Sequence, residues 1–337
     1  MQVKQLSIVI PAYFEEEVIE QCYDQLKAVA EQTNYSYELI FINDGSKDRT
    51  LDILLQIAKQ DNTVKIIDFA RNFGHQAAVS AGINRACGDA IVIIDADLQD
   101  PPEVIHQMLA KWEEGYDIVY GKRKRREGET WFKLITAKYF YKFLHYMSDV
   151  DIPRDTGDFR LIDRKVAYVF NRMSEKNRFI RGMISWVGFK QSYVEYDRHE
   201  RFAGVTKYPF KKMIKFASDG IVSFSSKPLR YIMKMGFFAV LLAFVVLVYS
   251  VCAKILGFPT EAGWTSIMVA ITLFSGVQLL SLGIIGEYIA RIYDESKDRP
   301  LYIVQDEINF DSALDSGHSR HQGDDRLASV PVKVGRR

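Results

Sequence analysis

Two aspartates separated by a single residue are the first group in this sequence that could carry chemistry. Asp95 and Asp97 follow a short apolar run, Ala90–Ile94, and side chains two positions apart in an extended chain point to the same side. Converging carboxylates suit a hard divalent cation such as Mg²⁺ or Mn²⁺, whose other ligands would include substrate phosphates. The alternative is that these aspartates only precede a helix that begins near Asp100–Glu103. The spacing alone favours neither interpretation.

Polar and turn-forming residues also end two earlier apolar runs. They are Pro11, Ala12, Tyr13 and Glu15 after the run at 6–10, and Asn43, Asp44 and Gly45 after the run at 37–42. Acidic groups that follow several neighbouring strands would gather at one edge of a sheet. A polar, acidic ligand site at that edge is therefore predicted.

The elements that must position these groups are short strands alternating with helices. Four apolar runs rich in β-branched residues are Leu6–Ile10, Tyr37–Ile42, Val64–Phe69 and Ala90–Ile94. Apolar residues between the first two runs recur at helical spacing, as Val18, Cys22, Leu26 and Val29 do. This alternation predicts an α/β fold with a mainly parallel, Rossmann-like sheet and helices on both faces.

Several other kinds of site lack their core residues. The sequence has no GxGxxG after the first strand, no GxxxxGK[ST], no HExxH and no GxSxG. Its three cysteines are far apart, and its six histidines form no cluster; His75 beside Gly74 could touch a phosphate or serve the structure alone. The 44 Lys and Arg residues nearly balance 43 Asp and Glu residues, so a nucleic-acid partner is not expected.

Two uncharged stretches near the C-terminus are long enough to cross a membrane. They occupy 235–253 and 262–286, and at about 1.5 Å per helical residue each reaches close to the ~30 Å hydrocarbon thickness. The alternative is a pair of buried core helices. Gly257 and Pro259 predict a tight turn between them, and basic outer flanks place both termini in the cytoplasm. We expect a multi-pass protein of the plasma membrane.

The full division of the chain follows from these patterns. The basic, amphipathic stretch at 208–233 fits helices lying in a membrane surface, although an ordinary surface helix has the same pattern. The tail is rich in Asp, Ser, Gly and Arg, which is typical of disorder. The predicted parts are a cytosolic catalytic domain at 1–207, juxtamembrane helices at 208–233, a hairpin at 234–290, a cytosolic return segment at 291–310 and a disordered tail at 311–337.

Four motifs occurring in a fixed order identify a family resemblance. They are Ser7–Tyr13 (SIVIPAY), Asn43–Asp48 (NDGSKD), Asp95–Glu103 (DADLQDPPE) and Gly157–Leu161 (GDFRL). The chain resembles the family-2 inverting glycosyltransferases of GT-A fold, in particular the bacterial polyprenyl-phosphate glycosyltransferases, such as bactoprenol glucosyltransferases and relatives of dolichyl-phosphate mannose synthase. The resemblance covers about residues 5 to 305 and includes the hairpin.

The resemblance implies a role for each motif residue in binding the donor. The implied donor-binding residues are Pro11, Ala12, Tyr13, Glu15, Asp44, Asp95, Ala96 and Gln99. Asp97 and Asp95 are the implied ligands of Mg²⁺ or Mn²⁺. Arg123 is implied as a catalytic basic residue facing phosphate, although the run 122–126 could also be solvated charge. Arg201 and Lys207, in a basic loop, are implied to bind the acceptor phosphate.

Asp158 matches the aspartate that the family places at the reaction centre, and Asp155 is its local rival. A phosphomonoester has a second pKa near ~6, so a polyprenyl phosphate is already a dianion at cytosolic pH. Asp158 could therefore act as a base, orient the acceptor, hold a basic side chain or stabilise positive charge that develops at the sugar. The remaining alternative is a purely structural aspartate.

The implied activity is a metal-dependent, inverting hexosyltransferase. It would move a sugar from a UDP-sugar donor to polyprenyl (undecaprenyl) phosphate at the membrane, for glycosylation of the cell envelope. Glucose and N-acetylglucosamine are both candidate sugars. The alternatives are a processive polysaccharide synthase, whose QxxRW motif is absent here, and a non-catalytic module that senses nucleotide sugars. Small residues four apart in both spans permit close helix contacts, and the resemblance rather than this spacing favours a homo-oligomer.

Overall fold

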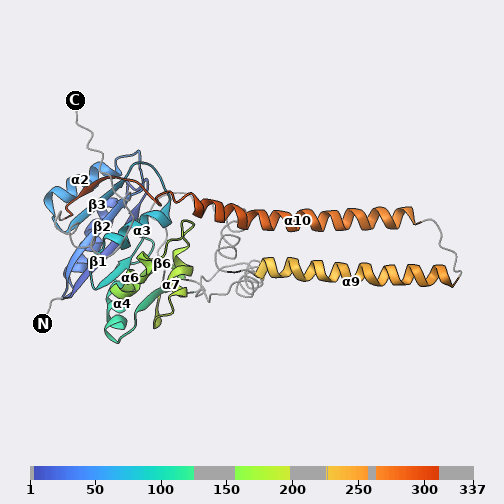
Figure 1. Ribbon diagram of the computed structural model, residues 1–337. Coiled ribbons are helices and arrows are strands. Elements are labelled where there is room, and N and C mark those ends of the chain that lie inside the picture. Colours follow the sequence, from blue (N-terminus) through green and yellow to red (C-terminus); the bar gives the residue numbers. More distant parts are fainter. Residues whose placement is uncertain (1–3, 125–155, 198–224, 226, 257–262, 311–337) are drawn as a thin grey trace, which may run out of the picture. The chain divides into compact units, whose positions relative to one another are not determined.

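The computed structural model describes residues 4–124, 156–197, 225, 227–256 and 263–310 (Figure 1). The chain divides into two compact units. One comprises Met1–Lys138, Val150–Pro209 and Arg299–Arg337, and the other comprises Tyr139–Asp149 and Phe210–Asp298. The first unit contains an eight-stranded sheet, and the second contains two long helices.

Four parallel strands form the centre of the sheet. They are β1 (Gln5–Ala12), β2 (Ser36–Asn43), β3 (Val64–Phe69) and β4 (Ala90–Ile93), in the order β4-β1-β2-β3. Ile8 lies opposite both Leu39 and Val92, so these strands end at a common edge. All four strands coincide closely with the predicted apolar runs, which confirms the α/β interpretation of this region.

Strands outside this centre make the sheet mixed, but six of its eight described strands run in the same direction, so it is mainly parallel, as predicted. β6 (Thr156–Asp163) is antiparallel to β4, and β5 (Ile118–Arg123) is antiparallel to β6. β7 (Gln191–Tyr196) runs parallel to β5, while β8 (Val304–Ile308) is antiparallel to β3. The two reversed strands, β6 and β8, were not predicted, because the pattern of alternating strands and helices covers only the first four strands.

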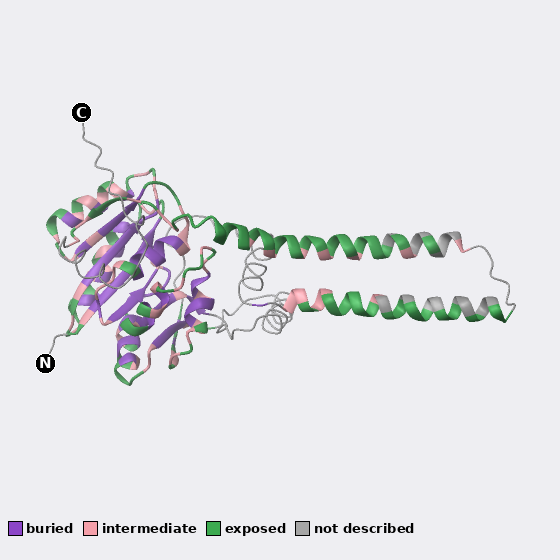
Figure 2. Ribbon diagram, viewed as in Figure 1, coloured by how far each residue is buried: buried purple, intermediate pink, exposed green. Residues whose placement is uncertain are grey.

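Helices cover both faces of the sheet, as predicted. They are α1 (Ile19–Glu31), α2 (Thr50–Gln60), α3 (His75–Arg85), α4 (Val104–Glu113), α6 (Arg164–Asn171) and α7 (Ile180–Trp186). Leu6 and Ile8 of β1 belong to a core shared with α1, α2 and α4. On the other face, a methyl group added to Gly82 of α3 would lie 2.2 Å from Val9 Cγ1, so α3 packs directly on β1. Buried residues are concentrated in these layers (Figure 2).

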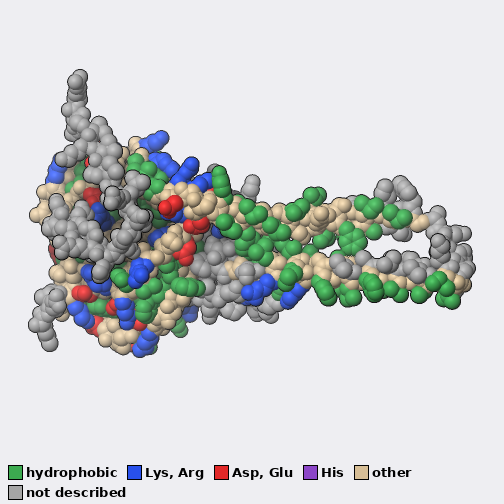
Figure 3. All heavy atoms as spheres, viewed as in Figure 1, with side chains coloured by type: hydrophobic (Ala, Val, Ile, Leu, Met, Phe, Trp, Pro, Cys, Tyr) green, Lys and Arg blue, Asp and Glu red, His purple; other side chains and the backbone are tan. Residues whose placement is uncertain are grey.

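The second unit contains α9 (Lys227–Ile255) and α10 (Trp264–Ser296), which contact each other. Both helices carry exposed apolar side chains along their length (Figure 3). Among the described residues, one stretch, Leu273–Ser296, is long and apolar enough to cross a membrane. Helices therefore occupy both predicted spans, whereas the crossing of a bilayer by each of them stays a prediction.

Some predicted regions lie outside the described residues. These are the turn at 257–262, most of the juxtamembrane stretch 208–233 and the tail 311–337. The predicted return segment contains β8, so part of it joins the sheet of the first unit.

Candidate active site

A cavity of about 390 Å³ lies at the carboxyl ends of β1, β2 and β4. Its lining comprises Pro11, Ala12, Tyr13, Glu15, Asp44, Asn72, Gly74, His75, Ala78, Asp95, Ala96 and Asp97. All the predicted donor-binding residues except Gln99 are in this set, and Gln99 is buried. Strand register explains the gathering, because each residue lies at the end of a parallel strand or follows one that ends at this edge.

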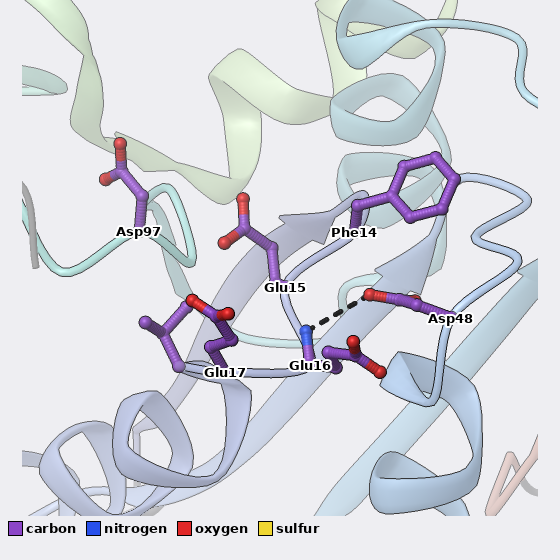
Figure 4. Close-up of a pocket in the computed structure, with 7 residues that line it drawn as sticks. Phe14, Glu15, Glu16, Glu17, Asp48 and Asp97 are labelled. Atoms are coloured by element: carbon purple, nitrogen blue, oxygen red, sulfur yellow. Dashed lines mark hydrogen bonds between the residues drawn. The ribbon is translucent and has the colours of Figure 1, made fainter. Parts of the chain in front are cut away.

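A second cavity of about 310 Å³ shares Glu15 and Asp97 with the first. Figure 4 shows it between the loop after β1, which carries Phe14, Glu15, Glu16 and Glu17, and Asp97 on the loop after β4. Phe14 has a φ of 58°, a conformation that a bulky side chain rarely adopts. Its N–H donates to Ser46 Oγ at 3.1 Å, which holds the β1 loop against the turn after β2.

Asp44 is held by the loop that follows β3. Its carboxylate accepts the backbone N–H of Phe73 at 2.7 Å, the N–H of Gly74 at 2.9 Å and the side-chain amide of Asn72 at 2.9 Å. Burial raises the pKa of Asp44, and the two backbone N–H groups oppose that rise. The result is a rigid, polar wall on one side of the larger cavity.

Asp95 and Asp97, the predicted metal ligands, both line the larger cavity. Asp95 Oδ1 is buried and accepts no hydrogen bond from the described residues, while Asp97 Oδ1 accepts the N–H of Gln99 at 3.2 Å. Burial raises the pKa of Asp95 to about 6, although the nearby His75 lowers it. The described part of the chain contains no cluster of three or more metal-ligating side chains. Two carboxylates suit Mg²⁺ or Mn²⁺ when substrate phosphates and water complete the shell.

The sheet brings Asp158 close to Asp95. β6 pairs with β4 in antiparallel register, with Arg160 opposite Ile93, so Asp158 extends past the end of β4. His75 lies between the two carboxylates, with its Nε2 atom 3.3 Å from Asp158 Oδ2 and 3.7 Å from Asp95 Oδ1. Burial lowers the pKa of His75, but both carboxylates together outweigh burial and raise it. His75 thus connects the larger cavity to Asp158.

Arg181 of α7 holds Asp158 with two parallel hydrogen bonds. Its Nε atom lies 2.8 Å from Asp158 Oδ1, and its Nη2 atom lies 3.0 Å from Asp158 Oδ2. Arg160 is buried beside this pair and donates hydrogen bonds to the carbonyl oxygens of Gly157 and Asp158. Burial would raise the pKa of Asp158, but His75, Arg181 and Arg160 hold it well below its ordinary value. Asp158 is therefore an anion with its position fixed by cations.

Comparison with known proteins decides the family. The sequence model of glycosyl transferase family 2 matches residues 7–170. A glycosyltransferase of Bacillus subtilis (strain 168), YkcC, which is described as uncharacterised, is 56% identical over 301 residues, which cover 89% of this chain and 93% of the relative. This chain belongs to glycosyl transferase family 2.

Other relatives of this family-2 glycosyltransferase extend the match to the C-terminal helices. An uncharacterised glycosyltransferase of Synechocystis sp. (strain ATCC 27184 / PCC 6803 / Kazusa), sll0501, is 47% identical over 90% of this chain and 95% of its own length. A bactoprenol glucosyl transferase of Shigella phage SfV is 41% identical over 90% of this chain and 98% of its own. The model named GtrB C-terminal hairpin matches residues 227–292. The predicted family resemblance is confirmed.

The structure places some predicted site residues of the glycosyltransferase away from the cavities. Arg123 of β5 directs its guanidinium to Asp100 at 3.4 Å and to Tyr196 Oη at 3.3 Å. It also packs on Gly157, where an added methyl group would lie 2.6 Å from Arg123 Nη2. Its predicted contact with phosphate stays a prediction, as do the roles of Arg201 and Lys207, which lie outside the described residues.

Sequence reasoning missed Asn72 and Arg181 and left His75 open between two roles. No motif marks Arg181, because it lies in a short helix far from Asp158 in the chain and only the fold joins them. His75 directly follows Gly74, whose φ is 99° at the start of α3, and Asn72 lies two residues before that glycine. The sequence signal that could have identified this loop was a glycine followed by a histidine shortly after a predicted strand.

Proposed function

We propose that this protein is a membrane-bound hexosyltransferase that moves a sugar from a UDP-sugar to a polyprenyl phosphate with inversion at the anomeric carbon. The observation that carries the proposal is the similarity to bactoprenol glucosyl transferases along nearly their whole length, sheet and hairpin together. Because those relatives are named for glucosyl transfer, glucose is the first sugar to test and N-acetylglucosamine the second.

In this proposal the donor occupies the larger cavity. The uracil and ribose lie against Tyr13 and Asp44, and the diphosphate lies toward Asp95 and Asp97. Asp97 and Asp95 would hold Mg²⁺ or Mn²⁺, which supplies positive charge against the departing diphosphate. The orphaned Oδ1 atom of Asp95 supports this arrangement, because a buried carboxylate oxygen needs a partner.

The transfer is a single in-line displacement. An oxygen of the lipid phosphate attacks the anomeric carbon, an O–C bond forms, and the bond between that carbon and the diphosphate oxygen breaks. The products are a β-linked polyprenyl-phosphate sugar and UDP. No proton has to leave the nucleophile, because the phosphate is already a dianion above its second pKa of ~6. Asp158, paired with Arg181, is therefore proposed to orient the acceptor side of the site rather than to act as a base.

Membrane insertion fits the lipid acceptor. We propose that α9 and α10 both cross the plasma membrane and that both termini are cytoplasmic. A cysteine introduced at Ser296 should resist a membrane-impermeant thiol reagent in intact cells and react after lysis. One at Thr260 should react from outside. Labelling of position 296 in intact cells would contradict the hairpin.

Assembly into a homo-oligomer is a separate proposal. It is tested by the mass of the particle in nanodiscs, where the mass of a monomer would count against it.

The decisive experiment is transfer by the purified full-length protein. Undecaprenyl phosphate is incubated with a panel of UDP- and GDP-sugars, with and without a chelator, and the lipid product is identified by mass spectrometry. A single glycosylated lipid from one UDP-sugar is the expected result. Polymeric product would instead indicate a processive synthase. UDP binding without any transfer would indicate a sensing module, and either outcome would overturn the proposal.

A further inference from the structure

The segment that follows α10 is firmly attached to the far edge of the sheet. β8 pairs with β3, with Ile308 opposite Ile66, and the N–H of Ala70 donates to the carbonyl oxygen of Ile303 at 3.1 Å. Two side-chain anchors secure its C-terminal end. Glu307 forms two hydrogen bonds with Arg85 at 2.6 and 2.9 Å, and Asn309 donates to the carbonyl oxygens of Ala58 and Val64.

The two ends of this segment lie at opposite ends of β3. β3 runs toward the edge that carries the cavities, and β8 runs in the opposite direction. The N-terminal end of β8, near Tyr302, therefore lies beside the carboxyl end of β3, whereas Asn309 lies at the other end. Any effect on the donor cavity should come from the Tyr302 end.

A row of three aromatic rings leads from this segment to the cavity wall. The ring of Tyr302 stacks on Phe69 with centroids 5.0 Å apart and planes at 13°. Phe69 in turn meets Phe73 edge to face, with centroids 5.7 Å apart and planes at 87°. Phe69 is only 2% exposed, and burial raises the pKa of Tyr302. Rings packed in this way hold one another in place.

The last ring of this row belongs to the residue that holds Asp44. The N–H of Phe73 donates to Asp44 Oδ1 at 2.7 Å, and the neighbouring Asn72 and Gly74 bind the same carboxylate. On its other side this loop packs against Gly45, where a methyl group would lie 2.4 Å from the backbone of Arg71. The loop is thus confined between the Asp44 turn and the aromatic row, and loss of one support would let it move.

We propose that Tyr302 is a positioning residue for the donor site, acting through Phe69 and Phe73 on the carboxylate of Asp44. The assignment of the occupant as a uridine nucleotide rests on the proposed function, whereas the positioning of Asp44 does not. The segment that leaves the predicted second membrane span then supports the cavity in which the donor binds. Tyr302 makes no contact with substrate in this scheme.

The test compares variants at the two ends of the segment in the full-length protein. Tyr302→Ala should raise the Kd for UDP and the KM for the UDP-sugar by about tenfold, with the KM for lipid phosphate unchanged within about twofold. Tyr302→Phe keeps the stacked ring and should behave like the parent. Asn309→Ala removes two hydrogen bonds at the opposite end, so it should lower the Tm without changing UDP affinity.

A readout that needs no ligand separates this inference from the proposed function. Amide hydrogen exchange of Phe73 and Gly74 should be faster in Tyr302→Ala and unchanged in Asn309→Ala. If the parent fails to bind UDP, the proposed function is wrong, and exchange at these two amides still decides the positioning role. Unchanged exchange in a folded Tyr302→Ala protein, or equal acceleration in Asn309→Ala, would overturn it. Tyr302→Leu, which retains most of the buried volume, provides the same comparison if the alanine variant does not fold.

Discussion

Replacement of Arg181 by alanine tests whether the pair with Asp158 serves the chemical step. The side chains are 29% and 15% exposed, so the pair is partly buried. Breaking a fully buried ion pair costs about 3–5 kcal/mol, whereas exposed pairs contribute at most about 1 kcal/mol. His75 and Arg160 remain near Asp158 in the variant. If the pair is needed in the transition state, its removal should raise the activation free energy by about 2–3 kcal/mol. This rise corresponds to about a 30- to 160-fold fall in turnover.

The assay measures turnover with saturating lipid phosphate and, separately, the affinity for UDP by calorimetry. Neither Arg181 nor Asp158 lines the larger cavity, so UDP affinity should change by less than about threefold. Asp158→Asn should give the same pattern. Arg172→Ala is a matched control, because Arg172 contacts Tyr168 at the exposed end of α6. Arg181 and Asp158 do not serve the chemical step if UDP affinity falls as far as turnover does, or if turnover stays within about threefold of the parent.

Three further expectations concern the metal, the Asp44 turn and acid stability. Asp97→Asn, or EDTA added to the parent, should remove most turnover, and full activity in EDTA would exclude the metal. Gly45→Ala should lower the free energy of unfolding by about 2–4 kcal/mol in denaturant titrations, because Gly45 has a φ of 67° and its added methyl group meets backbone. Burial would raise the pKa of Asp61, but hydrogen bonds from Lys27 and Thr63 outweigh burial and hold it well below its ordinary value. This contribution to stability is present above the unfolded pKa of about 3.9 and is lost as pH falls through the folded pKa. Asp61→Asn should therefore lose less stability than the parent between pH 6 and pH 3, and equal losses would contradict the assignment.

The parallel part of the fold could be predicted because its signals are local. Each central strand is a short β-branched run with a helical pattern behind it, and polar residues mark the point where the strand ends. The gathering of Asp44, Asp95 and Asp97 follows from that alternation alone. The antiparallel strands carry no comparable signal, because their partners are chosen by packing between distant segments.

The same limit applies to the site. Asp158 was found through its motif, yet its approach to Asp95 depends on β6 lying beside β4, which no periodicity reveals. Arg123 lies against Asp100 and Tyr196 in the fold, contacts that its position in the sequence does not reveal, and its contact with phosphate stays a prediction. A sequence shows which side chains carry charge, but a basic side chain selects among several nearby acidic groups only after the strands are paired.

The position of β8 has a consequence for synthesis of the protein. Asn309 and its partner Val64 are 245 positions apart. At about 5–20 residues per second, ribosomes need roughly 12 to 50 s between making β3 and making the strand that covers it. During that interval, in which both long helices are also made, the edge of β3 has backbone groups without their final partner, and bare edges of this kind favour aggregation. Nascent chains stalled before residue 304 should therefore depend on chaperones more strongly than chains that contain β8.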